Sequence, residues 1–378
     1  MPSTQLFPEV IDASTLGAKF TSSIYLPIGV EGWIDAASGG DAVVNQIYAI
    51  TTPAEAVQRF GPATISIVKL INFLLARGVA PVYAVASKRS VTIPTLAERQ
   101  AAWANLESDE RVRIRLTDSV IQAEHVALAD SAEFAELINN KQFAIVGMPA
   151  ATSKANLLTA AAAIASKRGV LVGPGVYDNS GVLQSGMYAA AAVAAEVSKN
   201  ADPSDDLDLL KIPNLTGIEL DAQGMPIFRR KVVAGVPAND FEDLLAGGVS
   251  PLMAGRGGGV DITHLRTTWT TDGTFDSLMT RIIADQVFVD VRAYLYEQKY
   301  LRAPNIQATR DRIRSGVEAL LLDRRDWIST KTQEDGSQGF NVQVRSSADQ
   351  RQVTVAYEGM INRGISTIQV AANLEITV

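Results

Sequence analysis

The last eleven residues of the chain alternate strictly between two faces, one of which is wholly apolar. The apolar face carries Ile368, Val370, Ala372, Leu374, Ile376 and Val378. This period of two predicts a half-buried β-strand that continues to residue 378. Because buried backbone N–H and C=O groups without partners cost free energy, such a strand must lie beside another strand. The segment therefore has to complete a sheet, either in its own domain or in another chain.

Length and composition indicate an ordered globular protein. A chain of 378 residues is long enough for two or three domains with a substantial core, and 47% of its residues are hydrophobic. The net charge of −7 is spread along the sequence, whereas general nucleic-acid and membrane-surface binders need a concentrated basic face. The absence of cysteine excludes disulfides and thiolate metal sites.

No targeting or membrane segment is expected. The first residues lack the charged and apolar regions of a secretory signal. The chain also contains no uninterrupted apolar run long enough to span a bilayer. We therefore expect a protein that is made and used in soluble form.

Short apolar segments that alternate with helical ones predict the fold class of the larger part. Two alanine-rich helices are expected at about 154–167 and 186–199, each close to a short apolar strand. This alternation is typical of a mainly parallel sheet that is covered on both faces. We predict an α/β fold, with a large α/β domain over residues 23–250 and an extended N-terminal arm at residues 1–22.

The last third of the chain has a different pattern. Two long amphipathic helices are predicted near residues 274–299 and 306–327, and in the second the residues Ile313, Val317, Leu320 and Leu321 form one apolar stripe. The predicted strands that follow them are 340–345, 352–358 and the terminal strand 366–378. We therefore expect a smaller α+β domain over residues 251–378, composed of two long helices and a small β-sheet.

The residues that carry catalysis in common enzyme classes are sparse. The chain has two histidines, His125 and His264, and Asp261 precedes the second, so a Ser-His-Asp triad can be drawn. However, no Gly-x-Ser-x-Gly motif marks a nucleophile, and two isolated imidazoles do not make a zinc site. We expect both histidines to be surface or structural residues. No catalytic residue, metal ligand or cofactor is predicted.

Two glycine-containing loops partly match phosphate-binding loops. Gly255–Gly259 is rich in glycine, but Val260 after it opens a strand, whereas a P-loop opens a helix. The stretch 147–155 follows a strand and contains Lys154, but Ser153 stands in place of the second glycine. Turn geometry is the favoured interpretation of both loops, and nucleotide binding is the alternative.

Several arginines lie on the second long helix and are interleaved with acidic residues. These arginines are Arg310, Arg312, Arg314, Arg324 and Arg325. A solvated helix face is the default interpretation of such a pattern. The alternative is a protein-binding face, on which charges set register and partner choice.

The order of several motifs resembles that of contractile phage tail sheath proteins, a family also found in phage-tail-like bacteriocins and related contractile injection systems. The motifs that resemble its N-terminal region are Ile50–Ala56, Arg59–Gly61 and Arg77–Tyr83. Those that resemble the join between its domains and the strand that follows are Ile218–Leu220, Asp240–Pro251, Gly255–Gly257 and Leu265–Thr268. In the C-terminal domain the resemblance rests on Pro304, Asn305, the second long helix and the terminal strand. The family often carries a bulky aromatic residue near Gly255–Gly257, where this chain has glycines.

The resemblance implies a structural protein and not an enzyme. It implies a sheath of stacked rings that surrounds an inner tube and contracts by subunit rearrangement to drive the tube through a target envelope. Residues 23–250 would form an outer domain of subtilisin-like shape, and residues 251–378 the inner sheath domain. The N-terminal arm and the C-terminal strand would be exchanged with neighbouring subunits.

The resemblance also implies partners and a location. The partners would be further copies of the chain, the inner tail tube protein, and the baseplate and tail terminator proteins, with no direct contact to nucleic acid and no membrane insertion. The location would be a virion tail or a phage-tail-like particle that is assembled in the cytoplasm of the host bacterium.

Particular residues can be assigned to these roles as hypotheses. The eleven tail residues span roughly 36 Å when extended, at about 3.3 Å each, which is enough to reach another subunit. The hinge candidates before the tail are Gly359, Arg363 and Gly364. A polar contact with the tube is easily released, and the candidates for it are Arg281, Arg292, Arg310 and Arg314.

Two other functions remain open. The first is an α/β enzyme, a hydrolase or a nucleotide-binding protein, that uses the Gly147 or the Gly255 loop. The second is a non-contractile virion or scaffold protein.

Overall fold

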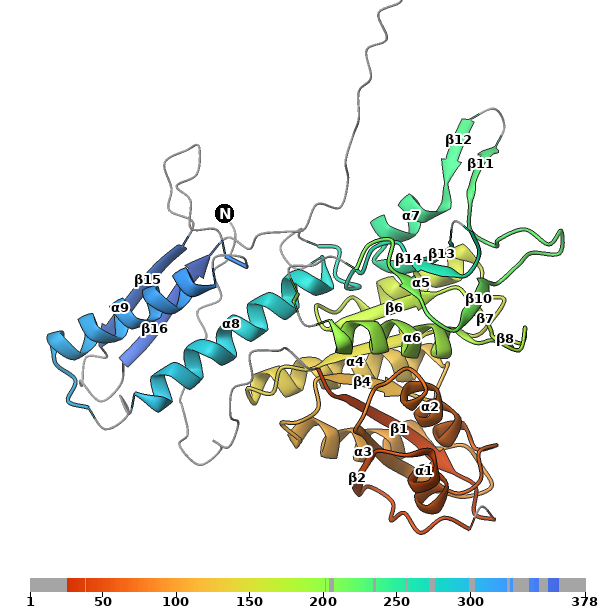
Figure 1. Ribbon diagram of the computed structural model, residues 1–378, viewed down its shortest axis with the longest axis horizontal. Coiled ribbons are helices and arrows are strands. Elements are labelled where there is room, and N and C mark those ends of the chain that lie inside the picture. Colours follow the sequence, from red (N-terminus) through yellow and green to blue (C-terminus); the bar gives the residue numbers. More distant parts are fainter. Residues whose placement is uncertain are drawn as a thin grey trace, which may run out of the picture. The chain divides into compact units, whose positions relative to one another are not determined.

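The chain forms two compact units, which Figure 1 shows in a computed structural model. The larger unit spans Ile24–Ala201 and Leu207–Leu278, and the smaller takes its described residues from Asp202–Asp206 and Met279–Val378. The structure describes residues 26–37, 39–200, 202–203, 207–233, 236–255, 257–271, 276–298, 303–324, 327–328, 340–346 and 353–359.

A nine-stranded sheet is the centre of the larger unit. Its strands are β1 (Ile28–Ile34), β2 (Ile47–Ile50), β3 (Val82–Arg89), β4 (Ile114–Thr117), β5 (Phe143–Gly147), β6 (Gly169–Gly173), β9 (Lys211–Ile212), β13 (Val249–Ala254) and β14 (Val260–Ile262). A three-stranded sheet contains β7 (Val176–Asp178), β8 (Leu183–Gln184) and β10 (Leu215–Ile218). A separate hairpin consists of β11 (Arg230–Val233) and β12 (Val236–Asn239).

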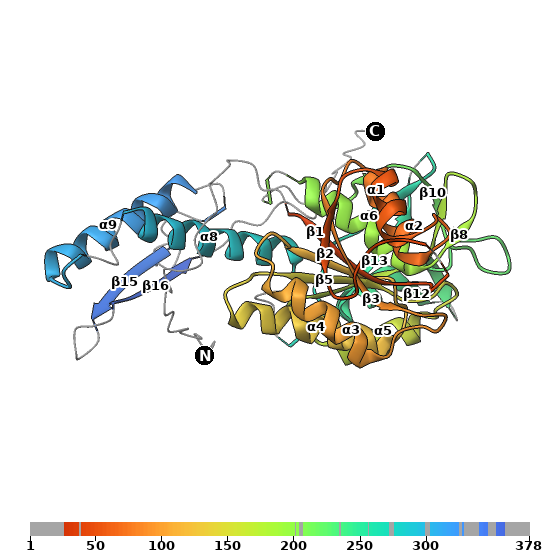
Figure 2. The ribbon, with the colours of Figure 1, turned by 90° about the horizontal axis from the view of Figure 1, so that it is seen from below.

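The strand order of the main sheet is β2-β3-β1-β4-β5-β6-β13-β14-β9. All neighbours from β3 to β13 are parallel, and the outer pairs β2–β3, β13–β14 and β14–β9 are antiparallel. In Figure 2 one face of the sheet is covered by α1, α2 and α6, and the other by α3, α4 and α5. The predicted fold class, a mainly parallel α/β sheet covered on both faces, is confirmed.

The helices of the larger unit begin and end where local sequence signals allow. They are α1 (Pro53–Phe60), α2 (Ser66–Leu75), α3 (Leu96–Ser108), α4 (Gln122–Leu137), α5 (Lys154–Ile164), α6 (Gly186–Lys199) and α7 (Asp240–Ala246). Thr52 and Glu55 form a reciprocal capping box at the start of α1, which fixes its first turn. Helix α5 ends three residues earlier than its predicted limit, because Ala165 adopts a left-handed conformation with φ of 40°.

Helix α6 lies very close to the sheet, which explains its composition of small residues. A Cβ atom at Gly147 would lie only 1.9 Å from the carbonyl oxygen of Gly186, so the end of β5 and the start of α6 meet backbone to backbone. The alanines of α6 are almost completely buried. The alanine-rich sequence is therefore the means by which this helix approaches the strands.

Strands β13 and β14 join the main sheet and extend the larger unit beyond the boundary expected at residue 250. Val249–Pro251 pairs with β6 in parallel, and Leu252–Ala254 pairs with β14. The compact unit continues to Leu278.

The smaller unit consists of two helices and a hairpin in its described residues. Its elements are α8 (Leu278–Glu297), α9 (Gln307–Asp323), β15 (Phe340–Ser346) and β16 (Val353–Gly359). The helix α8 starts at the last residue of the larger unit. Buried Ile313, Val317 and Leu321 form the predicted apolar stripe of α9, and β15 packs against this helix. Leu320, also assigned to the stripe, is half-buried.

Candidate functional site

The two histidines have structural environments. His264 Nδ1 lies 2.9 Å from Oδ1 of Asp208, whereas Asp261 lies against the backbone of Gly255. His125 is completely buried, with Nε2 3.0 Å from the carbonyl oxygen of Ser119. Burial lowers the pKa of His125 to about 4, although the hydrogen bond to Ser119 opposes this shift. Neither environment supports the Ser-His-Asp triad that was considered from the sequence.

Lys154, the one cation of the 147–155 stretch, is engaged by carboxylates. Its Nζ lies 2.8 Å from Asp240 Oδ1 and 2.8 Å from Asp243 Oδ2, both on α7. Ser153 accepts a hydrogen bond from the backbone N–H of Asn156 and thereby caps α5. These contacts join α5 to α7, so Lys154 serves packing of the larger unit and not a phosphate.

The loops at the carboxyl ends of β5 and β6, where α/β proteins commonly bind ligands, are closed. Buried Glu219 accepts hydrogen bonds from the backbone N–H groups of Ala151 and Gly175, at 2.5 and 3.2 Å. The space among Met148, Pro149 and the neighbouring side chains has no room for a water molecule.

The second glycine-containing loop forms a tight turn. Gly257, Gly258 and Gly259 have φ of 86°, 90° and 92°, a region that other residues rarely adopt. Strand β14 begins directly after them, as the sequence predicted. Since the turn joins two antiparallel strands and no helix begins there, turn geometry explains its glycines.

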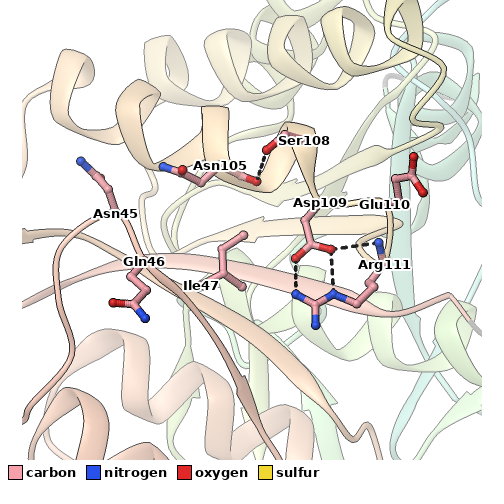
Figure 3. Close-up of a pocket in the computed structure, with 8 residues that line it drawn as sticks. All are labelled: Asn45, Gln46, Ile47, Asn105, Ser108, Asp109, Glu110 and Arg111. Carbon is pink, nitrogen blue, oxygen red and sulfur yellow. Dashed lines mark hydrogen bonds and ion pairs between the residues drawn. The ribbon is translucent and has the colours of Figure 1, made fainter. Parts of the chain in front are cut away.

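One open depression lies on the surface of the larger unit (Figure 3). It has a volume of about 620 Å³ and is lined by Asn45, Gln46, Ile47, Asn105, Ser108, Asp109, Glu110 and Arg111. Asp109 and Arg111 form an ion pair with each other, at 2.7 Å between Oδ2 and Nη2. Burial is the largest single influence on Asp109 and raises its pKa. The hydrogen bonds and the charge of Arg111 together outweigh burial, so the pKa of Asp109 lies below its ordinary value. The depression thus carries no uncompensated cluster of reactive groups.

A cluster of buried charges, which was not among the sites predicted from the sequence, is the most unusual polar feature of the larger unit. Arg99 Nη1 lies 2.8 Å from Glu31 Oε1 and 2.8 Å from Asp118 Oδ1. Arg99 Nε lies 2.9 Å from Glu124 Oε2. The four side chains come from β1, α3, the end of β4 and α4, and none is more than 7% exposed.

Two other kinds of site are absent from the described residues. These residues contain no group of three or more histidine or acidic side chains placed to hold a metal ion. None of the helices in the described part of the chain has the length and apolar character needed to cross a bilayer.

The hairpin of the smaller unit has one apolar and one polar face. Val342 pairs with Tyr357, and Val344 pairs with Val355, so these apolar side chains share the face that contains buried Val342. Exposed Thr354 lies on the opposite face. Within the described residues this sheet has two strands, each paired with the other.

The four arginines proposed to face a tube have different environments. Arg281 is 7% exposed and lies 3.5 Å from Asp285, one helical turn away on α8, and Arg292 is half-buried on the same helix. Arg310 donates hydrogen bonds to the start of α9, to Asn305 Oδ1 at 2.8 Å and to Gln307 Oε1 at 2.8 Å. Arg314 is exposed, with Nε 2.9 Å from Glu318 Oε1. Arg314 is therefore the candidate with the most accessible guanidinium group.

The remaining predicted site residues lie mostly outside the described residues. Gly359 is the last residue of β16. The hinge candidates Arg363 and Gly364, the N-terminal arm 1–22 and the terminal strand 366–378 lie outside the described residues.

The whole chain has the fold of sheath proteins from contractile particles. It is similar to the helical sheath of the anti-feeding prophage in the contracted state, with a TM-score of 0.66 and 13% identity over 99% of this chain and 100% of that chain. The PVC sheath complex of an extracellular contractile injection system, in the contracted state, gives a TM-score of 0.67 and 12% identity over 97% and 99% of the two chains. The sheath tail protein from Desulfitobacterium hafniense gives 0.63 and 11% over 93% and 100%.

At these identities the likeness shows a shared fold, and the predicted resemblance to contractile tail sheath proteins is confirmed at that level. No family model matches the sequence, and a search of curated proteins found no match.

Proposed function

We propose that this chain is the subunit of a contractile tail sheath, which polymerises as stacked rings around an inner tube and contracts to drive the tube through a target envelope. The observation that carries this proposal is the extent of the structural likeness. The chain matches sheath structures over nearly its entire length and nearly theirs, so both units take part in the likeness.

The two-stranded sheet of the smaller unit supports a role for strand exchange. A sheet of two strands is marginally stable in water unless further strands or helices cover it. Helix α9 packs against β15 of the hairpin, and an added strand would extend the sheet at its edge. We assign this strand to residues 368–378 of a neighbouring subunit, because their apolar alternation matches the one-sided apolar character of the hairpin.

Strand addition suits a lattice that has to move without coming apart. Each ladder hydrogen bond contributes about 0.5–1.5 kcal/mol net, so several bonds and one apolar row make a strong tether. The compact units would rotate and repack during contraction while the exchanged strands, and a hinge at Gly359, Arg363 and Gly364, keep the subunits connected. The energy would come from relaxation of a metastable extended lattice, with no nucleotide.

The partners follow from this role. The chain would bind further copies of itself, the inner tube, and the baseplate and terminator proteins at the two ends of the tail. Similarity to chains in structures of the anti-feeding prophage baseplate supports an association with a baseplate. The particle would be a virion tail or a phage-tail-like injection device that is assembled in the host bacterial cytoplasm.

A structural and not an enzymatic role is supported by the environments of the candidate catalytic groups. His125 is buried, Lys154 is held by two carboxylates, and the loops closed by Glu219 have no room for a ligand. A thermal-shift assay with nucleotides is the direct check, and we expect no change in the unfolding temperature.

Electron microscopy of the purified protein tests the main proposal. We expect hollow tubes in two lattices of different length, the shorter one wider, with conversion from the long to the short form on mild destabilisation. A single invariant lattice would instead indicate a non-contractile scaffold. Failure to form tubes under any condition would reject the sheath assignment.

A further inference from the structure

The charge cluster around Arg99 holds more acid than one cation can balance. Glu31, Asp118 and Glu124 each approach the same guanidinium group, at 2.8, 2.8 and 2.9 Å. Their side chains are 0%, 1% and 7% exposed, and that of Arg99 is 4% exposed. If all three carboxyl groups were ionised, the cluster would carry a net charge of −2 in a site that water does not reach. Buried charge without a counter-charge is costly, and a buried acid responds by taking up a proton.

One other buried cation lies on an element packed around Glu31: Arg115 on β4, whose Nη1 donates a hydrogen bond to Ser131 Oγ at 2.7 Å and whose charge interacts with Glu107. On β3, the neighbouring Ser87 is uncharged, and Lys88 forms its ion pair with Glu98, which is more than a third exposed. Lys69 on α2 is exposed at the surface. Within the described part of the chain, the ion pairs join these three carboxylates to no cation other than Arg99.

Two further titratable groups near the cluster are neutral at neutral pH. His125 on α4 has its pKa lowered to about 4 by burial. Tyr188 on α6 has its pKa raised by burial and by the charge of Asp118. Neither residue therefore compensates the carboxylates near pH 7.

Glu31 is the acid in this cluster with the greatest need of a proton. It is completely buried on β1 and shares Arg99 Nη1 with Asp118, so two carboxyl groups compete for one donor atom. Its Oε2 accepts hydrogen bonds from the Thr117 hydroxyl at 2.7 Å and from Trp103 Nε1 at 3.3 Å, and the Thr117 hydroxyl is a group that can reverse its role and accept from a protonated acid. Burial is the largest influence and raises the pKa of Glu31, and Asp118 adds to this effect, whereas the charge of Arg99 and the hydrogen bonds of Ser87 and Thr117 oppose it without reversing it.

We propose that Glu31 is an un-ionised carboxylic acid at neutral pH, so that the folded larger unit stores one proton inside its sheet. This inference does not depend on the sheath proposal, since it concerns the folded unit alone. A stored proton makes the stability of the folded unit depend on pH. Because the folded state binds one more proton than the unfolded state above the ordinary glutamate pKa of about 4.3, this group favours folding at mildly acidic pH and loses that contribution as the pH rises through its folded value.

Infrared spectroscopy of the whole chain near pH 7.5 tests the proposal directly. Exposed carboxyl groups are ionised at that pH, so a carbonyl stretch of an un-ionised acid reports a buried proton. We expect this band in the wild type, its loss in Glu31→Gln and its retention in the surface control Glu110→Gln. No such band in the wild type would overturn the proposal. Its retention in Glu31→Gln would overturn the assignment to Glu31, and its loss in Asp118→Asn would then place the proton on Asp118.

Denaturation experiments give a second, independent readout. The glutamine in Glu31→Gln imitates the neutral acid, and His125 titrates equally in both proteins and cancels from their ratio. We expect the unfolding constant of the wild type, divided by that of Glu31→Gln, to rise with pH by up to about tenfold per pH unit between the ordinary glutamate pKa and the folded pKa of Glu31. A ratio that does not change with pH, or that falls as the pH rises, would contradict the proposal.

Discussion

Asp290 on α8 and Arg324 at the end of α9 form an ion pair in which one carboxylate oxygen, Oδ2, lies 2.9 Å from Nε and 2.8 Å from Nη2. The Asp290 side chain is only 2% exposed, and burial raises its pKa against the effect of Arg324. The guanidinium group of Arg324 also lies over the ring of Trp327, 4.9 Å from its centroid. This pair therefore ties the two long helices of the smaller unit together.

We expect Asp290→Ala to destabilise the smaller unit by about 2 kcal/mol, because Arg324 loses its partner in a mostly buried site. The figure is below that for a fully buried pair, since Arg324 keeps access to water. Hydrogen exchange of the α8 and α9 amides measures the change. The matched control is Glu318→Ala, which breaks the more exposed Arg314–Glu318 pair within α9 and should cost at most about 0.5 kcal/mol. Equal effects of the two changes would contradict the prediction.

Gly147→Ala should severely destabilise the larger unit. The new Cβ would meet the backbone of Gly186 at 1.9 Å, and neither β5 nor α6 can withdraw without opening the core. A loss of about 3 kcal/mol or more, or failure to fold, is expected in chemical denaturation. Gly217→Ala is the control, because its nearest atom within 4 Å, on Tyr177, lies 3.9 Å away. The prediction is wrong if both variants unfold at the same denaturant concentration.

His125 should contribute to the stability of the larger unit a free energy that is lost as the pH becomes acidic. The folded pKa, about 4, lies below the ordinary value of about 6.5, so the unfolded state binds more protons between these values. Stability from this group is therefore complete above pH 6.5 and is lost as the pH falls, by about 3 kcal/mol at most. We expect the free energy of unfolding of the wild type, relative to that of His125→Gln, to fall as the pH drops from 6.5 to 4, a comparison in which the opposite contribution of Glu31 cancels. Parallel profiles would show that His125 does not titrate in this way.

Deletion of residues 368–378 should leave a folded protein that cannot form tubes. The segment follows β16 in the sequence, so its deletion removes the strand proposed for exchange and leaves the residues of α8, α9, β15, β16 and the larger unit in the chain. Circular dichroism checks that the fold is retained, and negative-stain microscopy checks assembly. A full-length control that carries Gln369→Ala and Asn373→Ala keeps the apolar face and should still assemble. Normal tubes from the truncated chain would refute strand exchange by this segment.

Arg314→Glu should weaken binding to the inner tube and leave the stability of the fold nearly unchanged. Arg314 is the most exposed of the four tube-facing candidates, and reversal of its charge would repel an acidic tube surface. Co-sedimentation of sheath with tube measures binding, and a decrease of about tenfold is expected from the loss of one interfacial pair. Arg59→Glu, an exposed change on the larger unit, serves as the control. Undiminished binding of the Arg314 variant would remove this residue from the interface.

Local sequence predicted local structure well. The limits of α6, residues 186–199, follow from its composition, and the Thr52-Pro53 start of α1 follows from its capping residues. The apolar spacing of Ile313, Val317 and Leu321 identified the buried face of α9. These features depend on residues within about one or two helical turns of each other, so the sequence alone contains the information.

The buried charge cluster could not be predicted in the same way. Glu31 interrupts the apolar run of β1, which was a usable signal that a buried charge needs a partner. Its partner Arg99 lies sixty-eight residues away, on a helix that the sequence analysis did not assign. Nothing in the sequence distinguishes Arg99 from the exposed arginines of the chain until the helix is placed against β1.

The sequence by itself determined the fold class, the helix caps, the apolar faces and the alternation of the terminal segment, because each depends on spacing along the chain and on the preferences of single residues. Only the tertiary structure decided that three carboxyl groups share Arg99, that Lys154 is bound by α7, and that Arg281 is buried while Arg314 is exposed. Burial and charge pairing arise between residues that are far apart in sequence. They are therefore fixed by the order of strands in the sheet and by the packing of helices, and not by local pattern.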